Sequence, residues 1–421
     1  MWHGDQGPQP DPAGGGRLPL KVTVIGGSIG GLSAAVWLRE LGCEIDIFER
    51  SPVLLEDRGA GILLNPATVR YFVERRVLDV RRIAAPIRKL QYLGRDGQLL
   101  ATLPTRWWSS AYNVVYRSLL ACVDRERYHL GEEAIGVEQD KGQARVTFAS
   151  GRVERADLAI FADGVNSAGR RVLAPGSDPV YAGYIAWRGT VSEAFLQPAT
   201  FALLDASMTY HVLEAGHMLA YPVPNRDGTV EPGRRLMNWL WYRNVEQPVL
   251  EELLVGRDGR RFTASVPAGF VAERHIVQLY ADARALLPEP FAELVTLTAE
   301  PFIEVIADVE VDRMVFGRAC LIGDAAFRPR PHAAAGTAKA AEDAYRLAIA
   351  LAAHRGEVPA ALRAWESQQL ALGRAVVERA RQAGDRLQQG RWQVGEPAPF
   401  GLYQISDSTM LEEQLVPHGV S

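Results

Sequence analysis

The feature that most constrains the fold is a glycine cluster placed between a short apolar segment and a helical pattern. Residues 21–25 (KVTVI) are apolar and β-branched, which predicts a buried strand, and a helical pattern follows from residue 30 to residue 41. A second strand is predicted at 44–49 (EIDIFE). Together these form a βαβ unit, the usual start of a parallel sheet, so we expect a nucleotide-binding α/β fold.

The glycine cluster itself predicts the ligand type. Gly26, Ser28 and Gly31 occupy the glycine positions of a G-x-G-x-x-G motif, and Ile29 and Gly30 lie between them. Glycines allow a tight turn and a close approach of the backbone to a pyrophosphate at a helix N-terminus, whose amides favour anions. Glu49 ends the second strand near the ~20-residue spacing expected for an acid that binds ribose hydroxyls. A ligand-free glycine turn is the alternative.

Composition excludes several classes of protein. A chain of 421 residues, at ~150 per domain, predicts two or three domains or one large enzyme fold. With 48% hydrophobic and 23% charged residues the chain can bury a sizeable core. Its net charge of −4 does not indicate the positively charged surface that binds nucleic acid. Three cysteines are too few for a disulfide framework or a tetrahedral metal site, so we expect no metal.

Targeting signals are not evident in the sequence. No segment reaches the ~20 apolar residues that a membrane span requires, and residues 1–19 lack the apolar part of a signal peptide. We therefore expect a disordered tail at 1–19, no membrane association and a cytoplasmic location.

Residues 180–245 differ from the rest of the chain in composition and in the pattern of their side chains. They are rich in aromatic and β-branched residues in alternation, which predicts a mostly antiparallel sheet inserted into the nucleotide-binding fold. Further strands are predicted at 126–130, 134–139, 144–149 and 157–161, and helices at 65–76, 273–297, 338–356 and 359–386.

Two later motifs point to the nucleotide. Residues 320–344 (CLIGDAAFRPRPHAAAGTAKAAEDA) place Gly-Asp after an apolar strand, then a proline-rich loop and a helix start. Residues 162–167 (ADGVNS) follow another predicted strand. In this order, over residues 20–385, the motifs resemble those of the single-component FAD-dependent aromatic hydroxylases, which have the p-hydroxybenzoate hydroxylase fold. Residues 58–66 (RGAGILLNP) and 234–244 (RRLMNWLWYRN) are similar to the 2,6-dihydroxypyridine 3-monooxygenase-like group.

The resemblance implies a fold and a cofactor. We expect a Rossmann-like FAD-binding domain in two parts (20–175 and 313–386), an inserted β-sheet substrate domain (176–312), long C-terminal helices and an extension at 387–421. The implied FAD site consists of Gly26, Ser28, Ile29, Gly30, Gly31, Glu49, Arg50, Ile62, Arg117, Asp163, Asp324, Ala335, Gly336, Thr337 and Ala338. No second strand–glycine–helix unit is visible, so NADH or NADPH is expected to act as a transient reductant.

The substrate cavity is expected between the inserted sheet and the flavin. The candidate wall residues are Tyr184, Trp187, Tyr210, His211, Tyr221, Asn238 and Trp239, with core packing as the alternative for each aromatic residue. His211 and His332 are the candidates for substrate deprotonation, since imidazole titrates near neutral pH.

The implied reaction is hydroxylation of a small electron-rich aromatic or N-heteroaromatic ring by molecular oxygen, through a flavin hydroperoxide and at the expense of NAD(P)H. An FAD-dependent oxidase or dehydrogenase without oxygen insertion stays open as an alternative, as does a non-catalytic flavin-binding module. The sequence also leaves open whether the chain forms a homodimer.

Overall fold

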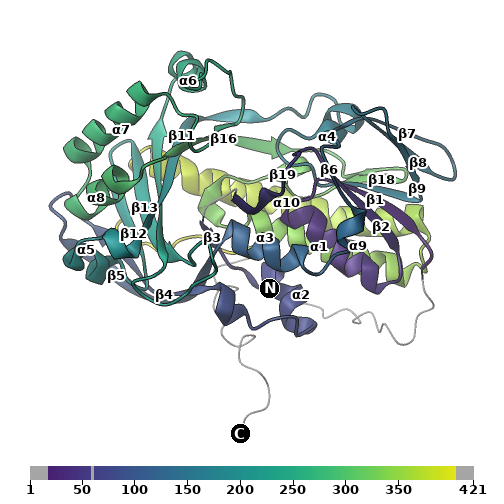
Figure 1. Cartoon of the computed structure of the whole chain (residues 1–421), viewed down its shortest axis with the longest axis horizontal. Helices are drawn as coiled ribbons and strands as arrows, with labels where there is room; N and C mark the ends of the chain where they lie inside the picture. Colours follow the sequence, from purple (N-terminus) through teal and green to yellow (C-terminus); the bar gives the residue numbers. More distant parts are fainter. Residues whose placement is uncertain (1–17, 58–60, 404–421) are drawn as a thin grey trace, which may run out of the picture.

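The computed structural model describes residues 18–57 and 61–403, in which three sheets are formed. Figure 1 shows the largest sheet on the left and a smaller parallel sheet on the right, with helices between and around them. The tail predicted at 1–19 therefore lies almost entirely outside the described residues, as does the extension beyond residue 403.

The smaller sheet is the nucleotide-binding core predicted from the first 50 residues. In spatial order its strands are β17 (Val315–Phe316), β18 (Ala319–Leu321), β10 (Leu158–Phe161), β1 (Lys21–Ile25), β2 (Glu44–Glu49) and β6 (Tyr128–Leu130). All neighbouring pairs are parallel except β17–β18. Because the carboxyl ends of β1, β10 and β18 meet at one edge, the three sequence motifs that follow these strands converge there.

The larger sheet has ten strands and contains more of the chain than the sequence predicted. Along its path lie β15 (Ser265–Val266), β16 (Phe302–Glu310), β11 (Val180–Ser192), β14 (Leu236–Asn244), β13 (Gly216–Val223), β12 (Ser207–Leu213), β4 (Ala85–Leu93), β5 (Leu99–Ala111) and β3 (Gly61–Leu63), and β19 (Phe327–Arg328) pairs with β16. The predicted segment 176–312 thus covers only part of it. Strands β3, β4 and β5 come from residues 61–111, because strand pairing joins segments that are distant in sequence.

Helices cover both faces of the larger sheet. On its outer face lie α5 (Pro198–Leu204), α6 (Gln247–Leu253), α7 (Glu273–Leu286) and α8 (Glu289–Leu297), seen at the left of Figure 1. The helical region predicted at 273–297 contains α7 and α8, which are separated at Leu287-Pro288 because proline disfavours helical backbone in the residue before it. The inner face contacts α10 (Val358–Gln388), which also packs on α9 (Gly336–Ala353).

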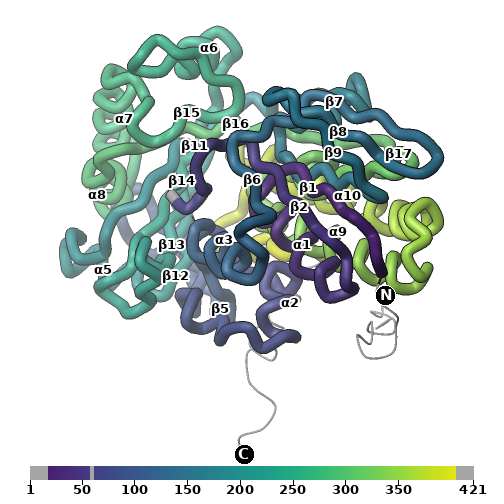
Figure 2. The backbone as a smooth tube through the Cα atoms, turned by 45° about the vertical axis from the view of Figure 1, so that its right-hand side comes forward, coloured from purple at the N-terminus to yellow at the C-terminus, as the bar shows by residue number. Residues whose placement is uncertain are grey.

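The remaining elements belong mostly to the nucleotide-binding part, except η4, which follows β11 of the larger sheet. They are α1 (Ile29–Glu40), α2 (Pro66–Glu74), α3 (Tyr112–Leu120), α4 (Ala168–Leu173), the short 3-10 turns η1 (Leu55–Asp57), η2 (Val80–Ile83), η3 (Arg125–Arg127), η4 (Glu193–Phe195), η5 (Gly323–Ala325) and η6 (Pro331–Ala333), and the small sheet of β7 (Ala134–Gln139), β8 (Ala144–Phe148) and β9 (Val153–Ala156). Figure 2 shows this small sheet at one edge of the molecule, beside β6. None of the helices in the described part of the chain is long and apolar enough to cross a membrane.

Candidate active site

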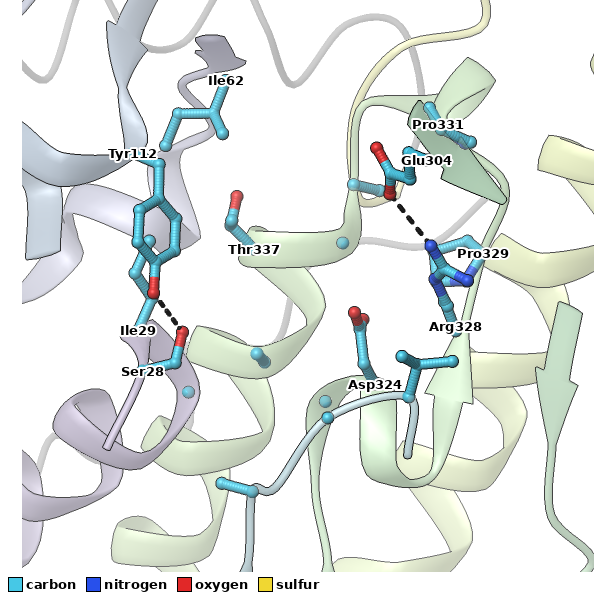
Figure 3. A pocket seen from close by; sticks show the side chains of 18 of the residues that line it. Ser28, Ile29, Ile62, Tyr112, Glu304, Asp324, Arg328, Pro329, Pro331 and Thr337 are labelled. Carbon is cyan, nitrogen blue, oxygen red and sulfur yellow. Dashed lines mark hydrogen bonds and ion pairs between the residues drawn. The ribbon is translucent and has the colours of Figure 1, made fainter. Parts of the chain in front are cut away.

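A cavity of about 580 Å³ lies between the two large sheets, where the three motifs converge. Figure 3 shows Ser28 and Tyr112 on one side of it, Glu304 and Arg328 on the other, and Asp324 and Thr337 between them. The residues predicted for FAD that line this cavity are Gly26, Ser28, Ile29, Gly30, Glu49, Arg50, Ile62, Asp163, Asp324, Ala335, Gly336 and Thr337.

Two positions at and just after the turn between β1 and α1 require glycine. Gly26 has a φ of +100°, and a Cβ there would lie 2.4 Å from the carbonyl oxygen of Ala162. A Cβ on Gly31 would lie 1.9 Å from the carbonyl oxygen of Gly26. The glycines therefore let α1 start close against β1, which leaves its N-terminus open to the cavity.

The N-terminus of α1 is suited to an anion. Its N-cap residue, Ser28, makes no side-chain cap bond; instead its hydroxyl lies 2.6 Å from the Tyr112 hydroxyl (Figure 3). The first turn holds no acidic residue. The amides and the positive end of the helix dipole are therefore available to a phosphate group.

Glu49 stabilises the glycine turn, in addition to the binding of ribose hydroxyls that was predicted for it. One carboxylate oxygen accepts the backbone N–H of Gly27 at 2.9 Å, and the other accepts that of Ser51 at 2.8 Å. This buried carboxylate thus orients the turn while it lines the cavity. Binding of a ribose hydroxyl would use its remaining lone pairs.

Side chains of the 162–167 motif stabilise the loop that the motif forms. The Asp163 carboxylate accepts from the Ser167 hydroxyl at 2.5 Å and from the Ala168 amide at 2.7 Å, at the start of α4. Arg170 donates to the carbonyls of Val165 and Ala325, which ties this loop to η5. Burial raises the pKa of Asp163, while the hydrogen bonds it accepts oppose the shift.

Asp324 and the start of α9 form the middle of the cavity. The Asp324 side chain faces the open space (Figure 3), and burial raises its pKa, with Arg328 opposing and Glu304 adding to the shift. The N-cap residue of α9, Ala335, offers no side-chain cap, and the first turn has no acid. A second helix N-terminus is thus open to the same cavity.

These residues fit FAD. One helix N-terminus could hold the pyrophosphate, the Asp324 carboxylate could hold a hydroxyl of the ribityl chain, and the α9 amides could face the carbonyl edge of the flavin ring. When bound, FAD supplies the redox chemistry and the activation of oxygen.

Three residues predicted for FAD do not line the cavity. Gly31 acts through the packing of α1, and Ala338 lies in a buried cluster of small side chains with Ala333. Arg117 donates to the carbonyl of Arg226 and stays outside the lining residues. Its contact with the pyrophosphate stays a prediction.

The predicted substrate-wall residues fall into two groups, according to the face of the larger sheet on which they lie. Strand registers place Tyr184, Tyr210, Tyr221 and Asn238 on the inner face of the larger sheet. The same registers place Trp187, His211 and Trp239 on the outer face, where the two tryptophans pack in a core with α7 and α8. Alternate residues of a strand point to opposite faces, so these three cannot form the wall.

The inner-face residues contribute in different ways. Tyr210 and Tyr221 line the cavity directly. Asn238 lies behind it and accepts the backbone N–H of Gly61 at 3.0 Å. Tyr184 also lies behind it, with its hydroxyl 2.8 Å from Nε2 of His332, which does line the cavity.

Sequence reasoning missed a charged cluster in the wall. Glu304 Oε2 lies 2.5 Å from Arg188 Nη1, and Glu304 Oε1 lies 2.9 Å from Arg328 Nη2. Two arginines share one carboxylate, so the cluster has a positive formal charge. Arg188 falls on the same face as Tyr184 in the alternating segment YIAWRGTV, and that period was the available signal. The other missed wall residues include Tyr112, Met208, Leu219, Leu240, Tyr242, Ile306 and Phe400.

His332 is held as a neutral ring. Burial lowers its pKa well below the usual range, and the neighbouring His217 and Arg330 lower it further. Burial also raises the pKa of Tyr184, so the hydrogen bond joins two neutral groups. A ring with so low a pKa is a weak base, which favours hydrogen bonding over proton abstraction as its role.

The expected pH dependence of stability is clearest at His217. Its ring is fully buried, stacks on Tyr242 at 4.6 Å, and has a pKa lowered by burial to about 3. In the unfolded chain the imidazole has a pKa of ~6.5, so below that pH it binds a proton that the buried ring of the folded chain does not bind. The free energy of unfolding therefore falls as the pH falls from ~6.5 towards 3. The contribution lost between pH 7.5 and pH 5 is roughly 2 kcal/mol.

His217→Phe keeps an aromatic ring and removes this titration. Urea unfolding at pH 7.5, 6 and 5 should show the variant losing less stability than the wild type as pH falls. The half-buried His354, replaced by glutamine, is the control and should follow the wild type. Parallel pH profiles for His217→Phe and wild type would contradict the assignment.

Asp324→Asn is expected to weaken FAD binding. It removes the charge of a carboxylate that faces the cavity, and a hydrogen bond to a charged group contributes roughly 1.5–3 kcal/mol, or about 10- to 150-fold in affinity. The measurement is the FAD dissociation constant of apoprotein by fluorescence titration. Arg117→Ala should change it less, since the guanidinium binds a backbone carbonyl outside the lining. An unchanged affinity in Asp324→Asn would mean that the cofactor lies elsewhere.

Comparison with known proteins agrees with this geometry. A family described as FAD binding domain matches residues 282–380, and one described as FAD binding domain-like matches residues 181–308. The chain is 36% identical to 2,6-dihydroxypyridine 3-monooxygenase from Paenarthrobacter nicotinovorans, over 93% of this chain and 98% of the relative. It is 30% identical to an FAD-dependent urate hydroxylase from Klebsiella pneumoniae, over 87% and 90% of the two chains.

The chain also resembles solved structures of such enzymes in its fold. The structure of 2,6-dihydroxypyridine-3-hydroxylase from Arthrobacter nicotinovorans has a TM-score of 0.87 and 35% identity, over 92% of this chain and 98% of that one. Klebsiella pneumoniae HpxO, complexed with FAD and uric acid, has a TM-score of 0.72 at 23% identity, over 94% and 92%, and shares the fold.

Fold, cavity and relatives together define the class: the chain belongs to the FAD-binding monooxygenase family. It is an FAD-dependent enzyme that hydroxylates an aromatic ring, with NAD(P)H as the reductant typical of these enzymes. The predictions of family, fold class, cofactor and reaction type are confirmed, and the oxidase and non-catalytic alternatives are set aside.

Proposed function

We propose that the substrate is a small hydroxylated N-heteroaromatic ring, of the dihydroxypyridine type, which binds as an anion. The observation that carries this proposal is the cluster in which Arg188 and Arg328 share the single carboxylate of Glu304 on the cavity wall. A ring that has lost a hydroxyl proton would balance the remaining positive charge. The activity of the relative that is 36% identical, a 2,6-dihydroxypyridine 3-monooxygenase, supports the same class.

The aromatic wall suits a flat ring. Tyr210, Tyr221 and Tyr242 line the cavity from one face of the larger sheet. Burial raises the pKa values of all three, so each tyrosine stays neutral and offers a hydroxyl together with an apolar ring. Such a wall could orient the ring and exclude water while its charged edge meets the arginines.

The reaction consumes one molecule of oxygen and one reductant for each ring hydroxylated. One oxygen atom replaces a ring hydrogen as a hydroxyl group, the other leaves as water, and NAD(P)H with a proton supplies the two electrons. An anionic ring is richer in electrons at carbon than the neutral one, which favours this electrophilic substitution. Since His332 is a weak base, we infer that the substrate loses its proton before it binds. We also place the reaction in the cytoplasm, where NADH and NADPH are supplied.

The test compares anionic and neutral rings. Wild-type enzyme should oxidise NAD(P)H faster with 2,6-dihydroxypyridine than with neutral pyridine, and Arg188→Met should lower kcat/KM for the anion by about 10- to 100-fold, as expected for a lost charged hydrogen bond. Arg284→Met, on exposed α7 behind the sheet, is the control. Equal activity with both rings, or an unaffected Arg188→Met, would overturn the proposal.

A further inference from the structure

The chain beyond α10 forms part of the cavity. Residues 391–403, here called the C-terminal strap, contain no helix or strand. Phe400 of this strap lines the cavity, although it lies far in sequence from every motif that builds the FAD site. Nothing in the sequence pattern assigned a task to this segment.

The first part of the strap is fixed to the larger sheet. The indole N–H of Trp392 donates to the Tyr92 hydroxyl at 3.1 Å, and that hydroxyl donates to the carbonyl of Glu396 at 2.7 Å. The Glu396 carboxylate also pairs with both terminal nitrogens of Arg386 on α10, at 2.5 and 2.6 Å. The strap is therefore anchored before it reaches the cavity.

The second part is fixed to the nucleotide-binding side. Arg379 of α10 donates to the carbonyls of Gly401, Leu402 and Tyr403. The Gly401 amide donates to the Ala333 carbonyl at 3.0 Å, within η6 and just before α9. The Tyr403 hydroxyl donates to Glu342 of α9 at 2.7 Å. The strap thus joins the sheet that faces the substrate to the loop that is expected to face the flavin.

Phe400 lies between these two anchors. Its side chain is buried, and its ring makes an edge contact with Trp107 of β5, with ring centres 5.2 Å apart. Leu63 and Ala334, which also line the cavity, have small or aliphatic side chains. A rigidly held aromatic ring at this position limits the room for a substrate on that side.

We propose that Phe400 is a specificity-determining residue, held by the C-terminal strap so that the cavity accepts single rings and excludes fused two-ring systems. The inference rests on the proposed function, because it assumes a hydroxylated N-heteroaromatic substrate. Its physical basis is steric: two anchors keep the strap in place, so a larger ring cannot displace Phe400 without breaking them.

The experiment measures binding of two probes to the FAD-loaded enzyme through changes in flavin absorbance. The probes are 2,6-dihydroxypyridine and a dihydroxyquinoline. In Phe400→Ala the quinoline should bind at least tenfold more tightly than to wild type, while the pyridine binds about tenfold more weakly and less product forms per NAD(P)H consumed. Phe400→Leu should lie between, and it carries the test if the alanine variant does not fold. Val394→Ala, at an exposed strap position, is the control and should match wild type.

The outcomes separate this inference from the proposed function. An unchanged ratio of the two dissociation constants in folded Phe400 variants would overturn the inference alone. Wild-type enzyme that binds neither probe yet hydroxylates an aromatic ring of another class would overturn the proposed function, and the inference with it.

Discussion

Gly31→Ala is expected to yield a protein that retains almost no FAD. The new Cβ would lie 1.9 Å from the Gly26 carbonyl oxygen and 3.1 Å from a Val24 methyl group. Gly26 cannot move aside, because it is itself packed against Ala162 at a φ of +100°. The start of α1 must therefore shift away from β1, and its amides leave the position at which they could hold the pyrophosphate.

The expected size of this effect is at least 100-fold in FAD affinity, with roughly 1–3 kcal/mol of lost stability from overpacking. Flavin content after gel filtration and a titration of the apoprotein with FAD give the two values. Gly136→Ala is the matched control, since a Cβ there meets nothing within 4 Å. If Gly31→Ala bound FAD as tightly as wild type, the pyrophosphate would not lie at α1.

Lys339→Met is expected to cause the largest loss of stability. Lys339 and Asp343 form an ion pair one turn apart on α9, and both side chains are buried. The second oxygen of Asp343 accepts the Gly323 amide at 3.0 Å, which fixes the turn that carries Asp324. Removal of the lysine leaves a buried carboxylate without its cation, which costs about 3–5 kcal/mol. Unfolding in urea should show this loss, together with a lower FAD content.

A double variant tests the cause. In Lys339→Met/Asp343→Asn the amide oxygen can still accept from Gly323, but no charge is buried alone, so we expect much of the lost stability to return. Lys141→Met, at an exposed lysine, should change little. If the double variant were as unstable as Lys339→Met, the loss would come from packing and not from charge.

The nucleotide-binding half of the fold could be predicted because its signals are local. The β1–α1–β2 unit, the glycine turn and the Gly-Asp turn each lie within a short stretch, and a strand followed by a helix has one common arrangement. The larger sheet was only partly predictable. Strands β4 and β5 belong to it because β4 pairs with β12, where Gln91 lies opposite Thr209, 118 residues further along the chain. No local pattern encodes that pairing.

The candidate site shows the same division. The first glycine motif was recognised by its spacing and the later FAD motifs by their resemblance to a known family, whereas the substrate wall required knowledge of which face each strand turns inward. Residue type alone selected Trp187 and Trp239, but the register places them behind the sheet. Once the inner face of the sheet is known, the same alternation of side chains identifies Arg188 as a residue of the cavity wall. Phe400 had no signal at all, because an irregular segment far along the chain reaches the cavity through tertiary anchors only.

We propose that this enzyme inserts an oxygen atom from O₂ into a hydroxylated N-heteroaromatic ring. The most direct measurement is a reaction of the FAD-loaded enzyme with NADH or NADPH and 2,6-dihydroxypyridine under ¹⁸O₂, followed by mass spectrometry of the product. We expect one ¹⁸O atom in each molecule of hydroxylated product, and none when the label is supplied as water. Oxidation of NAD(P)H with only hydrogen peroxide formed, or a product labelled from water, would contradict it.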